Sequence, residues 1–248
     1  MTEHEPTAPA AIATLILALA ALLAEALSGF GSRLDWWSFR DGFTLLKWAA
    51  FVGLAAVVMG GVTAFRTRSG RGRRGFGWAL TGVALGALAT GVPALWMVRA
   101  QRVPAIHDIS TDTENPPVFS VLLALRRDAT NPATYGGPEV AAQQRRAYPD
   151  IAPLLLKRPP AEALQLALKV GRELGWVIVD AEPESGRLEA TAVTFWFGFK
   201  DDVVVRVRPA DGGSRVDIRS LSRVGKSDVG ANAERIRRFL RRMAELSR

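Results

Sequence analysis

Three apolar stretches near the start of this 248-residue chain constrain its fold more than any other feature. Each holds at most one charged residue, and together they cover residues 6–31, 43–65 and 75–98. A bilayer core requires about 20 apolar residues in helical form. The sequence therefore predicts a membrane region over residues 1–98, with transmembrane helices at about 9–30, 43–65 and 76–98.

The loop between the second and third stretches predicts how the chain lies across the membrane. Its sequence, RTRSGRGRR at residues 66–74, places five arginines in nine positions. Short loops rich in arginine stay cytoplasmic. A cleaved signal peptide is disfavoured, because the residues before the first stretch are acidic and no A-x-A site follows it. We expect a multi-pass membrane protein with a cytoplasmic N-terminus and an extracytoplasmic C-terminal part.

Glu25 and Lys47 are the charged residues inside the predicted spans. Antiparallel helices would bring them to a similar depth. One hypothesis is an ion or proton site, because charge within a membrane is costly. The favoured interpretation is an interhelical ion pair, with Lys47 reaching toward the interface. Gly82 and Gly86 in the third span have the spacing of close helix packing.

Composition excludes several kinds of chemistry. The chain has no cysteine, and its histidines are His4 and His107. Disulfides, thiolate catalysis and cysteine- or histidine-rich metal sites are therefore excluded, and we expect neither a metal nor a cofactor. Gly70–Gly75 matches GxGxxG but follows no strand, and Gly225-Lys226-Ser227 lacks the first glycine of a phosphate-binding loop. Neither motif supports nucleotide binding.

The C-terminal part has the pattern of one α+β domain. Residues 99–117 are predicted to be a connector and residues 118–248 the domain, with a proline-rich stretch to Pro160 that we expect to be mostly ordered loop. Helical spacing of apolar residues predicts helices at about 160–174 and 228–246. Alternation predicts strands at 176–181, 187–197, 201–209 and 214–222. The expected order is a helix, a four-stranded antiparallel meander and a helix.

The turn around Gly212 fixes the expected register of the last hairpin. Arg206 should lie opposite Asp217, and Val204 opposite Arg219. One face, expected to take the helices, then carries Trp196, Val203, Val205, Val207, Val216 and Ile218. The other face is mainly basic, with Arg206, Arg208, Arg215 and Arg219 beside Asp217 and Glu189, and an apolar end at Phe195, Phe197, Val204 and Leu221.

The same register places Lys200 near Arg223, so a cluster of polar residues should converge at one end of the sheet. A helix N-terminus there would favour a small anionic or polar ligand. The alternative, which we favour, is a helix cap combined with salt bridges that join loop to turn. The candidate residues are Lys200, Asp201, Asp202, Arg223, Lys226, Ser227, Asp228 and Asn232.

The last helix carries five arginines, which suit anionic headgroups or a partner but more often form a solvated face. Nucleic acid would suit the charge, but the predicted sidedness excludes it as a partner. These arginines are Arg235, Arg237, Arg238, Arg241 and Arg242.

Four segments resemble the domain of unknown function family 1499, over about residues 105–246. The resemblance implies a bacterial membrane-linked or periplasmic protein with plant relatives in chloroplasts, and it implies no reaction. Many members carry cysteines near the start of the domain, so any role of those cysteines is missing here. The segments are DISTDTENPP (108–117), YPDIAPL (148–154), TFWFGFKDDVVVRVRP (194–209) and SRVDIRSLSRVGKSDVGANAERI (214–236).

Three functions fit these observations. The first is a non-catalytic binding or scaffold module for an envelope protein or an anionic envelope component. The second is a hydrolase-like enzyme that uses Asp201 or Asp202 as acid or base, with Lys200 and Arg223 orienting the substrate. The third is an accessory subunit of a membrane transport assembly, with Glu25 and Lys47 in a hydrated path. Self-association into a homo-oligomer is compatible with each of them.

Overall fold

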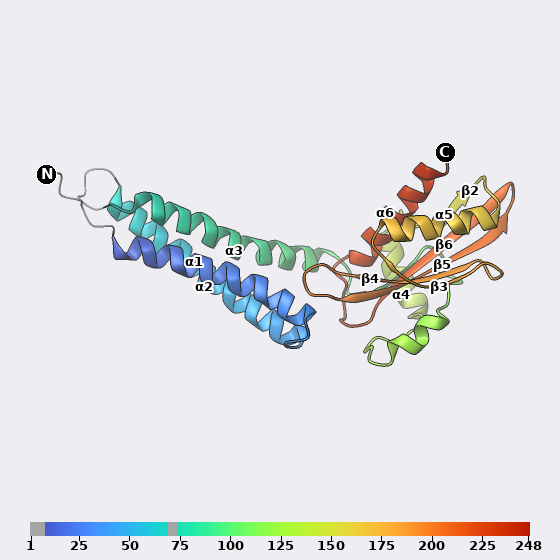
Figure 1. Ribbon diagram of the computed structural model, residues 1–248, viewed down its shortest axis with the longest axis horizontal. Coiled ribbons are helices and arrows are strands. Elements are labelled where there is room, and N and C mark those ends of the chain that lie inside the picture. Colours follow the sequence, from blue (N-terminus) through green and yellow to red (C-terminus); the bar gives the residue numbers. More distant parts are fainter. Residues whose placement is uncertain (1–7, 69–73) are drawn as a thin grey trace. The chain divides into compact units, whose positions relative to one another are not determined.

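The computed structural model describes residues 8–68 and 74–248 (Figure 1). The chain divides into two compact units. Unit 1 comprises Met1–Arg99 with Phe195–Gly198, and unit 2 comprises Ala100–Thr194 with Phe199–Arg248. Residues 69–73, which include most of the arginine-rich loop, lie outside the described residues.

Unit 1 contains the three predicted membrane helices: α1 (Pro9–Arg33), α2 (Phe39–Thr67) and the membrane part of α3 (Phe76–Arg102). All three are long and apolar enough to cross a membrane, so this prediction is confirmed. Ser38 starts α2 with a capping box, in which its hydroxyl accepts from the Asp41 amide and the Asp41 carboxylate accepts from the Ser38 amide.

Small residues allow the three helices to approach closely. A Cβ atom added to Gly86 of α3 would lie 2.7 Å from the carbonyl oxygen of Gly53 on α2. The methyl group of Thr14 on α1 occupies the space that a Cβ on Gly60 or Gly82 would need. Between lipid-exposed helices, such close contact is the main source of association. The expectation that Gly82 and Gly86 serve helix packing is confirmed.

The loop Phe195–Gly198 also belongs to unit 1. The Phe195 ring meets Phe30 edge-on at 5.6 Å between centroids, and Trp196 Nε1 donates to the carbonyl of Ala26 at 3.3 Å. Trp196 lies directly against Gly29, where a Cβ would come within 2.1 Å of its ring. The prediction that residues 195–197 continue a strand is therefore wrong.

Unit 2 is built on one antiparallel sheet with the order β1-β6-β5-β4-β3. The predicted four-stranded meander is confirmed, and so is its register, with Arg206 opposite Asp217 and Val204 opposite Arg219. The four strands are β3 (Val177–Glu182), β4 (Arg187–Val193), β5 (Lys200–Ala210) and β6 (Gly213–Ser222).

Two short strands extend the sheet beyond the predicted meander. Both β1 (Asp108–Ser110) and β2 (Leu154–Leu156) pair with the free edge of β6. The expected connector 99–117 thus supplies a strand, and the compact unit already begins at Ala100. The proline-rich stretch also contains a 3₁₀ helix, η1 (Val121–Arg126), and a helix, α4 (Gly137–Ala147).

One face of the sheet packs on α5 (Pro160–Glu173) and α6 (Ala231–Leu246), as Figure 1 shows. Alternate residues of β5 and β6, among them Val203, Val205 and Ile218, form the core with these helices, and Trp176 stacks on Phe239 at 5.1 Å. Trp196, expected on this face, is absent from it because β4 ends at Val193.

The opposite face of the sheet is covered by residues 117–135, drawn in green in Figure 1. Phe119 and Leu122 pack on Val204 and Leu221 and form a second core. The carboxylate of Glu189 is fully buried and accepts hydrogen bonds from the amides of Ser120 and Leu122, at 2.6 and 2.7 Å. Much of the predicted basic face is therefore an interior layer.

Candidate functional site

The end of the sheet brings the predicted site residues together. The backbone amide of Arg223 donates to the carbonyl of Lys200 at 3.1 Å, which holds the loop after β6 beside the start of β5. The expected convergence of turn and loop is present. The side chains, however, are engaged mostly with one another and with the covering segment.

Asp202 is the centre of a closed ion cluster. Its side chain is fully buried and accepts hydrogen bonds from Arg126 at 2.5 Å, from Arg223 Nε and Nη2 at 2.9 and 2.8 Å, and from Thr191 at 2.8 Å. A buried carboxylate needs such charge-assisted hydrogen bonds to offset the loss of its hydration. Arg126 comes from η1, within the proline-rich stretch that was expected to be mostly ordered loop.

Asp201 points to the other side of the sheet, toward α6. It forms an ion pair with Arg235 at 2.5 Å, and Arg235 also donates to the side-chain oxygen of Asn232. The fully buried Asn232 accepts from Ser220 at 2.7 Å and donates to the carbonyl of His107 at 2.9 Å. Asn232 thus joins β6, α6 and the entry to β1.

The N-terminus of α6 is capped by the chain itself. The Asp228 carboxylate accepts from the amides of Gly230 and Asn232, at 2.7 and 2.8 Å, and Ser227 Oγ accepts from the Val229 amide at 3.1 Å. Burial raises the pKa of Asp228 above its usual value, against these hydrogen bonds, which lower it. The chain's own carboxylate therefore occupies the position where a bound anion was expected.

Lys200 and Lys226 complete the predicted set. Both are exposed, and neither side chain forms an ion pair within the part of the chain that the structure describes. They are the members of the cluster that remain available to a ligand.

A second buried ion pair, which was not predicted from the sequence, lies on the covered face of the sheet. Asp108 of β1 accepts two hydrogen bonds from Arg219, at 2.8 and 2.7 Å. The Arg219 guanidinium also lies over the rings of Phe119 and Tyr135, and burial raises the pKa of Tyr135 to about 12. The sequence signal that could have indicated this ion pair is Asp108, the first residue of the segment DISTDTENPP (108–117) that resembles the family.

The remaining arginines of this face are also neutralised. Asp217 is fully buried and pairs with Arg206, Arg208 and Arg215 at 3.0 to 3.1 Å. Asp112 bridges the same arginines from the segment after β1. The three guanidiniums therefore hold the segment 108–117 on the sheet, and they do not form an open basic surface.

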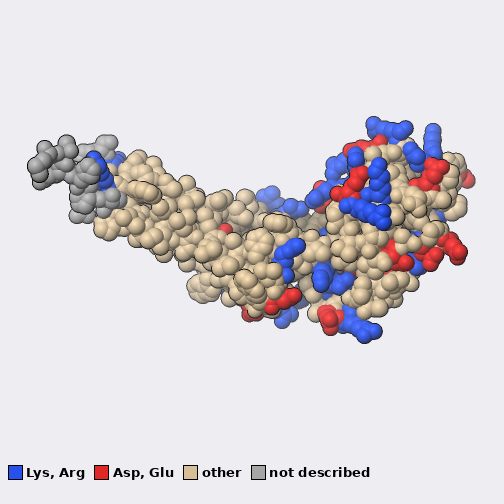
Figure 2. Space-filling model, in the orientation of Figure 1, with Lys and Arg blue, Asp and Glu red and all other residues tan. Residues whose placement is uncertain are grey.

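The arginines of α6 each have a carboxylate partner as well. Arg237 pairs with Asp150 at 2.5 Å, and this contact lowers the pKa of Asp150. Arg242 pairs with Glu173 of α5 at 2.9 Å. Figure 2 shows basic and acidic side chains interspersed over the visible face of unit 2. This pattern favours the solvated-face interpretation.

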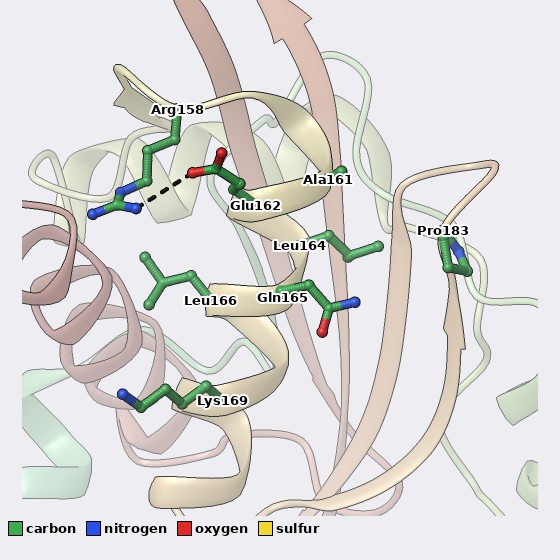
Figure 3. Close-up of a pocket in the computed structure, with 8 residues that line it drawn as sticks. All are labelled: Arg158, Ala161, Glu162, Leu164, Gln165, Leu166, Lys169 and Pro183. Carbon is green, nitrogen blue, oxygen red and sulfur yellow. Dashed lines mark hydrogen bonds and ion pairs between the residues drawn. The ribbon is translucent and has the colours of Figure 1, made fainter.

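A shallow groove of about 490 Å³ runs along the outer surface of α5 (Figure 3). Arg158 and Glu162 form an exposed ion pair at one end, 3.5 Å long, and Lys169 lies at the other. The side chains of Gln165 and Lys169 point away from each other in Figure 3, so the groove lacks the convergent polar groups of a ligand site. Within the described residues, no group of three or more acidic residues or histidines could hold a metal ion.

Glu25 and Lys47 do not form the predicted ion pair. Glu25 is buried in the bundle, with 7% of its surface exposed, whereas Lys47 lies on the exposed face of α2. Oε1 of Glu25 has no hydrogen-bond partner among the described residues. The two residues lie on different faces of the helix pair, which one-dimensional spacing could not reveal.

An exposed apolar ridge lies outside the predicted set. Residues 118–125 cover the sheet with Phe119 and Leu122 but direct four large aliphatic side chains to solvent. The exposed fractions are 73% for Val118, 43% for Val121, 49% for Leu123 and 52% for Leu125. We call these four residues the ridge. The segment contains no charged residue.

Comparison with protein families gives a match over residues 108–243, more than half of the chain, to the family described as "Protein of unknown function (DUF1499)". The match begins at β1 and ends within α6, so it includes the buried ion pairs and the ridge. No curated protein matches the chain.

Proposed function

The chain belongs to the DUF1499 family of proteins of unknown function, and from this premise we propose that it is a non-catalytic binding module of the bacterial cell envelope. Three helices anchor it in the inner membrane. The five arginines of residues 66–74 support a cytoplasmic position for that loop and hence a periplasmic position for the C-terminal domain.

The ridge is the observation that carries this proposal. Its four side chains belong to a segment that is firmly held, because the amides of Ser120 and Leu122 are bound to buried Glu189. Aliphatic side chains exposed on a rigid surface raise the free energy of the protein in water, and their burial lowers it. The ridge therefore suits a partner with an apolar groove.

Charge favours a protein partner over an anionic lipid surface. Segments that bind anionic headgroups combine apolar side chains with several lysines or arginines. The ridge segment, residues 118–125, carries none. Of the charged residues that follow it, Arg126 is buried, and the charges of Arg127 and Asp128 cancel. We therefore assign the ridge to an apolar surface on another envelope protein.

Single cysteines test this assignment, because the natural chain has none. The full chain with Val121→Cys, carrying a short photo-reactive crosslinker, is irradiated in intact membranes. We expect one heterologous protein adduct, reduced at least about tenfold by Leu123→Asp with Leu125→Asp, because each lost leucine removes roughly 1.5–3 kcal/mol of burial.

Leu155→Asp is the matched control, since Leu155 lies on β2 and is 70% exposed but is not part of the ridge. It should leave the adduct unchanged. Adducts to lipid alone, to a second copy of the chain alone, or to a protein whose capture ignores the ridge substitutions would contradict the proposal.

A second candidate ligand is an anionic envelope component at the sheet end. Exposed Lys200 and Lys226, with no ion-pair partner in the described part of the chain, support it. Lys200→Ala with Lys226→Ala should weaken salt-sensitive binding of inorganic polyphosphate to the full chain in neutral nanodiscs, whereas Lys169→Ala should not. Equal binding by both variants would reject this candidate.

The hydrolase hypothesis has less support. A general acid or base must reach a substrate proton. Asp202 is fully buried and bound to two arginines and a threonine, and Asp201 is 3% exposed and paired with Arg235. These bonds give both carboxylates a structural role.

A further inference from the structure

Glu25 is the buried ionisable group that the proposed function does not use. It lies in the middle of the buried stripe of α1, between Ala21 and Ser28. Its side chain is 7% exposed, and Oε1 has no hydrogen-bond partner among the described residues. An ionised carboxylate in this position would lack the compensation that buried charges require.

The depth of Glu25 follows from contacts on either side of it. Ser28 lies against Gly42 of α2, and Thr14 lies against Gly60, so α1 and α2 are antiparallel. Glu25 is therefore level with the helical turn of α2 that follows Gly42. Lys47 is at a similar depth but on the exposed face of α2. Glu25 and Lys47 therefore lie at a similar depth without contact, so an ion pair with Lys47 does not explain the buried carboxyl group of Glu25.

None of the elements that pack on α1 offers Glu25 a cation. The buried residues of α2 at this level are Gly42 and Ala49, and the cations of α2 nearest to it in sequence, Arg40 and Lys47, are exposed. From Phe76 to Val98, α3 has no charged residue, and the loop Phe195–Gly198 has none. Arg33, two turns further along α1, donates to the carbonyl of Phe195 at 2.9 Å.

The third helix, α3, contains a proline, Pro93, at a similar level. Thr14 packs against Gly82, and both Glu25 and Pro93 follow eleven residues later on α1 and α3, which run in the same direction. Proline has no amide hydrogen, so Pro93 cannot donate to the carbonyl of Ala89. A polar backbone group and a carboxyl thus lie at one depth within an otherwise apolar bundle.

We propose that Glu25 is a proton-binding site within the membrane: one oxygen of its carboxylate takes up a proton, which removes the uncompensated charge. The ligand is a proton, because among the described residues Glu25 belongs to no group of three acidic residues or histidines that could hold a metal ion. The step adds one proton to one carboxylate oxygen and requires no other reactant. This inference is independent of the ridge.

The test uses dicyclohexylcarbodiimide, an apolar reagent that reacts with protonated carboxyls in membranes. Full-length protein in native membranes is treated from about pH 5 to about pH 9, and the adduct is located by mass spectrometry. We expect labelling of Glu25 that falls about tenfold for each pH unit once the carboxyl ionises. Glu25→Gln should abolish the adduct.

Lys47→Met separates this proposal from an ion pair. If Glu25 binds a proton independently, the variant should be labelled like the natural chain. Labelling that appears only in Lys47→Met would show that Lys47 holds Glu25 ionised and would overturn the proposal. No adduct across the whole pH range, or protection by sodium at constant pH, would overturn it as well.

Discussion

At the scale of single residues, buried arginine–carboxylate contacts determine how the domain is held together. Asp108, Asp202 and Asp217 are buried in ion pairs, and each joins a strand to a segment distant in sequence or on the neighbouring strand. Such pairs contribute little net free energy compared with apolar packing, but removal of one partner leaves an uncompensated buried charge. The polar cluster at the sheet end is therefore part of the structure of the fold.

Asp202→Asn tests this role. The variant leaves Arg126 and Arg223 without their common counter-charge, so we expect a loss of about 3–5 kcal/mol in the free energy of unfolding. Denaturation of the detergent-solubilised full chain measures it. Asp211→Asn, in the exposed β5–β6 turn, is the control and should change stability by less than about 0.5 kcal/mol. A loss no larger than the control's would contradict the assignment.

Asp228 makes a testable contribution to pH dependence. Because burial raises its pKa in the folded state, its contribution to stability is present below the unfolded value and is lost as pH rises through the folded value. Asp228→Asn lacks this titration. The melting temperature of the natural chain minus that of the variant should therefore fall as pH rises from about 4 to about 7. A rise over this range would show that ionised Asp228 is the favoured form.

The sequence predicted which residues meet at the sheet end but not what they bind. Lys200 and Arg223 are neighbours because the register of β5 and β6 fixes them. Arg126 is 76 residues from Asp202, in a segment whose conformation depends on the sheet it covers. The local sequence pattern does not reveal such a contact. The cluster therefore looked available to a ligand in the sequence, although Arg126 occupies Asp202 in the structure.

At the scale of elements, length decides which structures the sequence reveals. The strands β5 and β6, of 11 and 10 residues, show clear alternation, and their register was predicted correctly. The strands β1 and β2 have three residues each, too few for any periodicity, and exist because the edge of β6 pairs with them. The aromatic run after β4 looked like a strand but forms a loop, with Gly198 at φ 68°.

Helix packing in the membrane bundle depends on single glycines. Gly86→Val places side-chain atoms against the backbone of Gly53, so we expect a loss of about 1–3 kcal/mol and a lower melting temperature in detergent. Gly91→Val is the matched control on the same helix, because a Cβ at Gly91 meets nothing within 4 Å. Equal effects of the two substitutions would show that the close approach of α2 and α3 contributes nothing.

At the scale of the whole molecule, the chain combines a membrane anchor and a folded domain, which are subject to different physical constraints. The anchor was predictable because three long apolar stretches have one common explanation. The start of the domain was not, since residues 108–117 are polar and become structured by ion pairs with β5 and β6. The ridge was not predicted, because an uncharged run such as Val118–Leu125 does not reveal which side chains face solvent, and four of its five valines and leucines do.

The proposed function requires the C-terminal domain to lie on the outer side of the membrane. Two single-cysteine variants of the full chain test it directly: Asp211→Cys in the β5–β6 turn and Arg68→Cys at the end of α2. Intact cells are treated with a maleimide that does not cross the inner membrane. We predict that Asp211→Cys is labelled and that Arg68→Cys is labelled only after the cells are opened. Labelling of Arg68→Cys alone in intact cells would contradict the claim and place the domain in the cytoplasm.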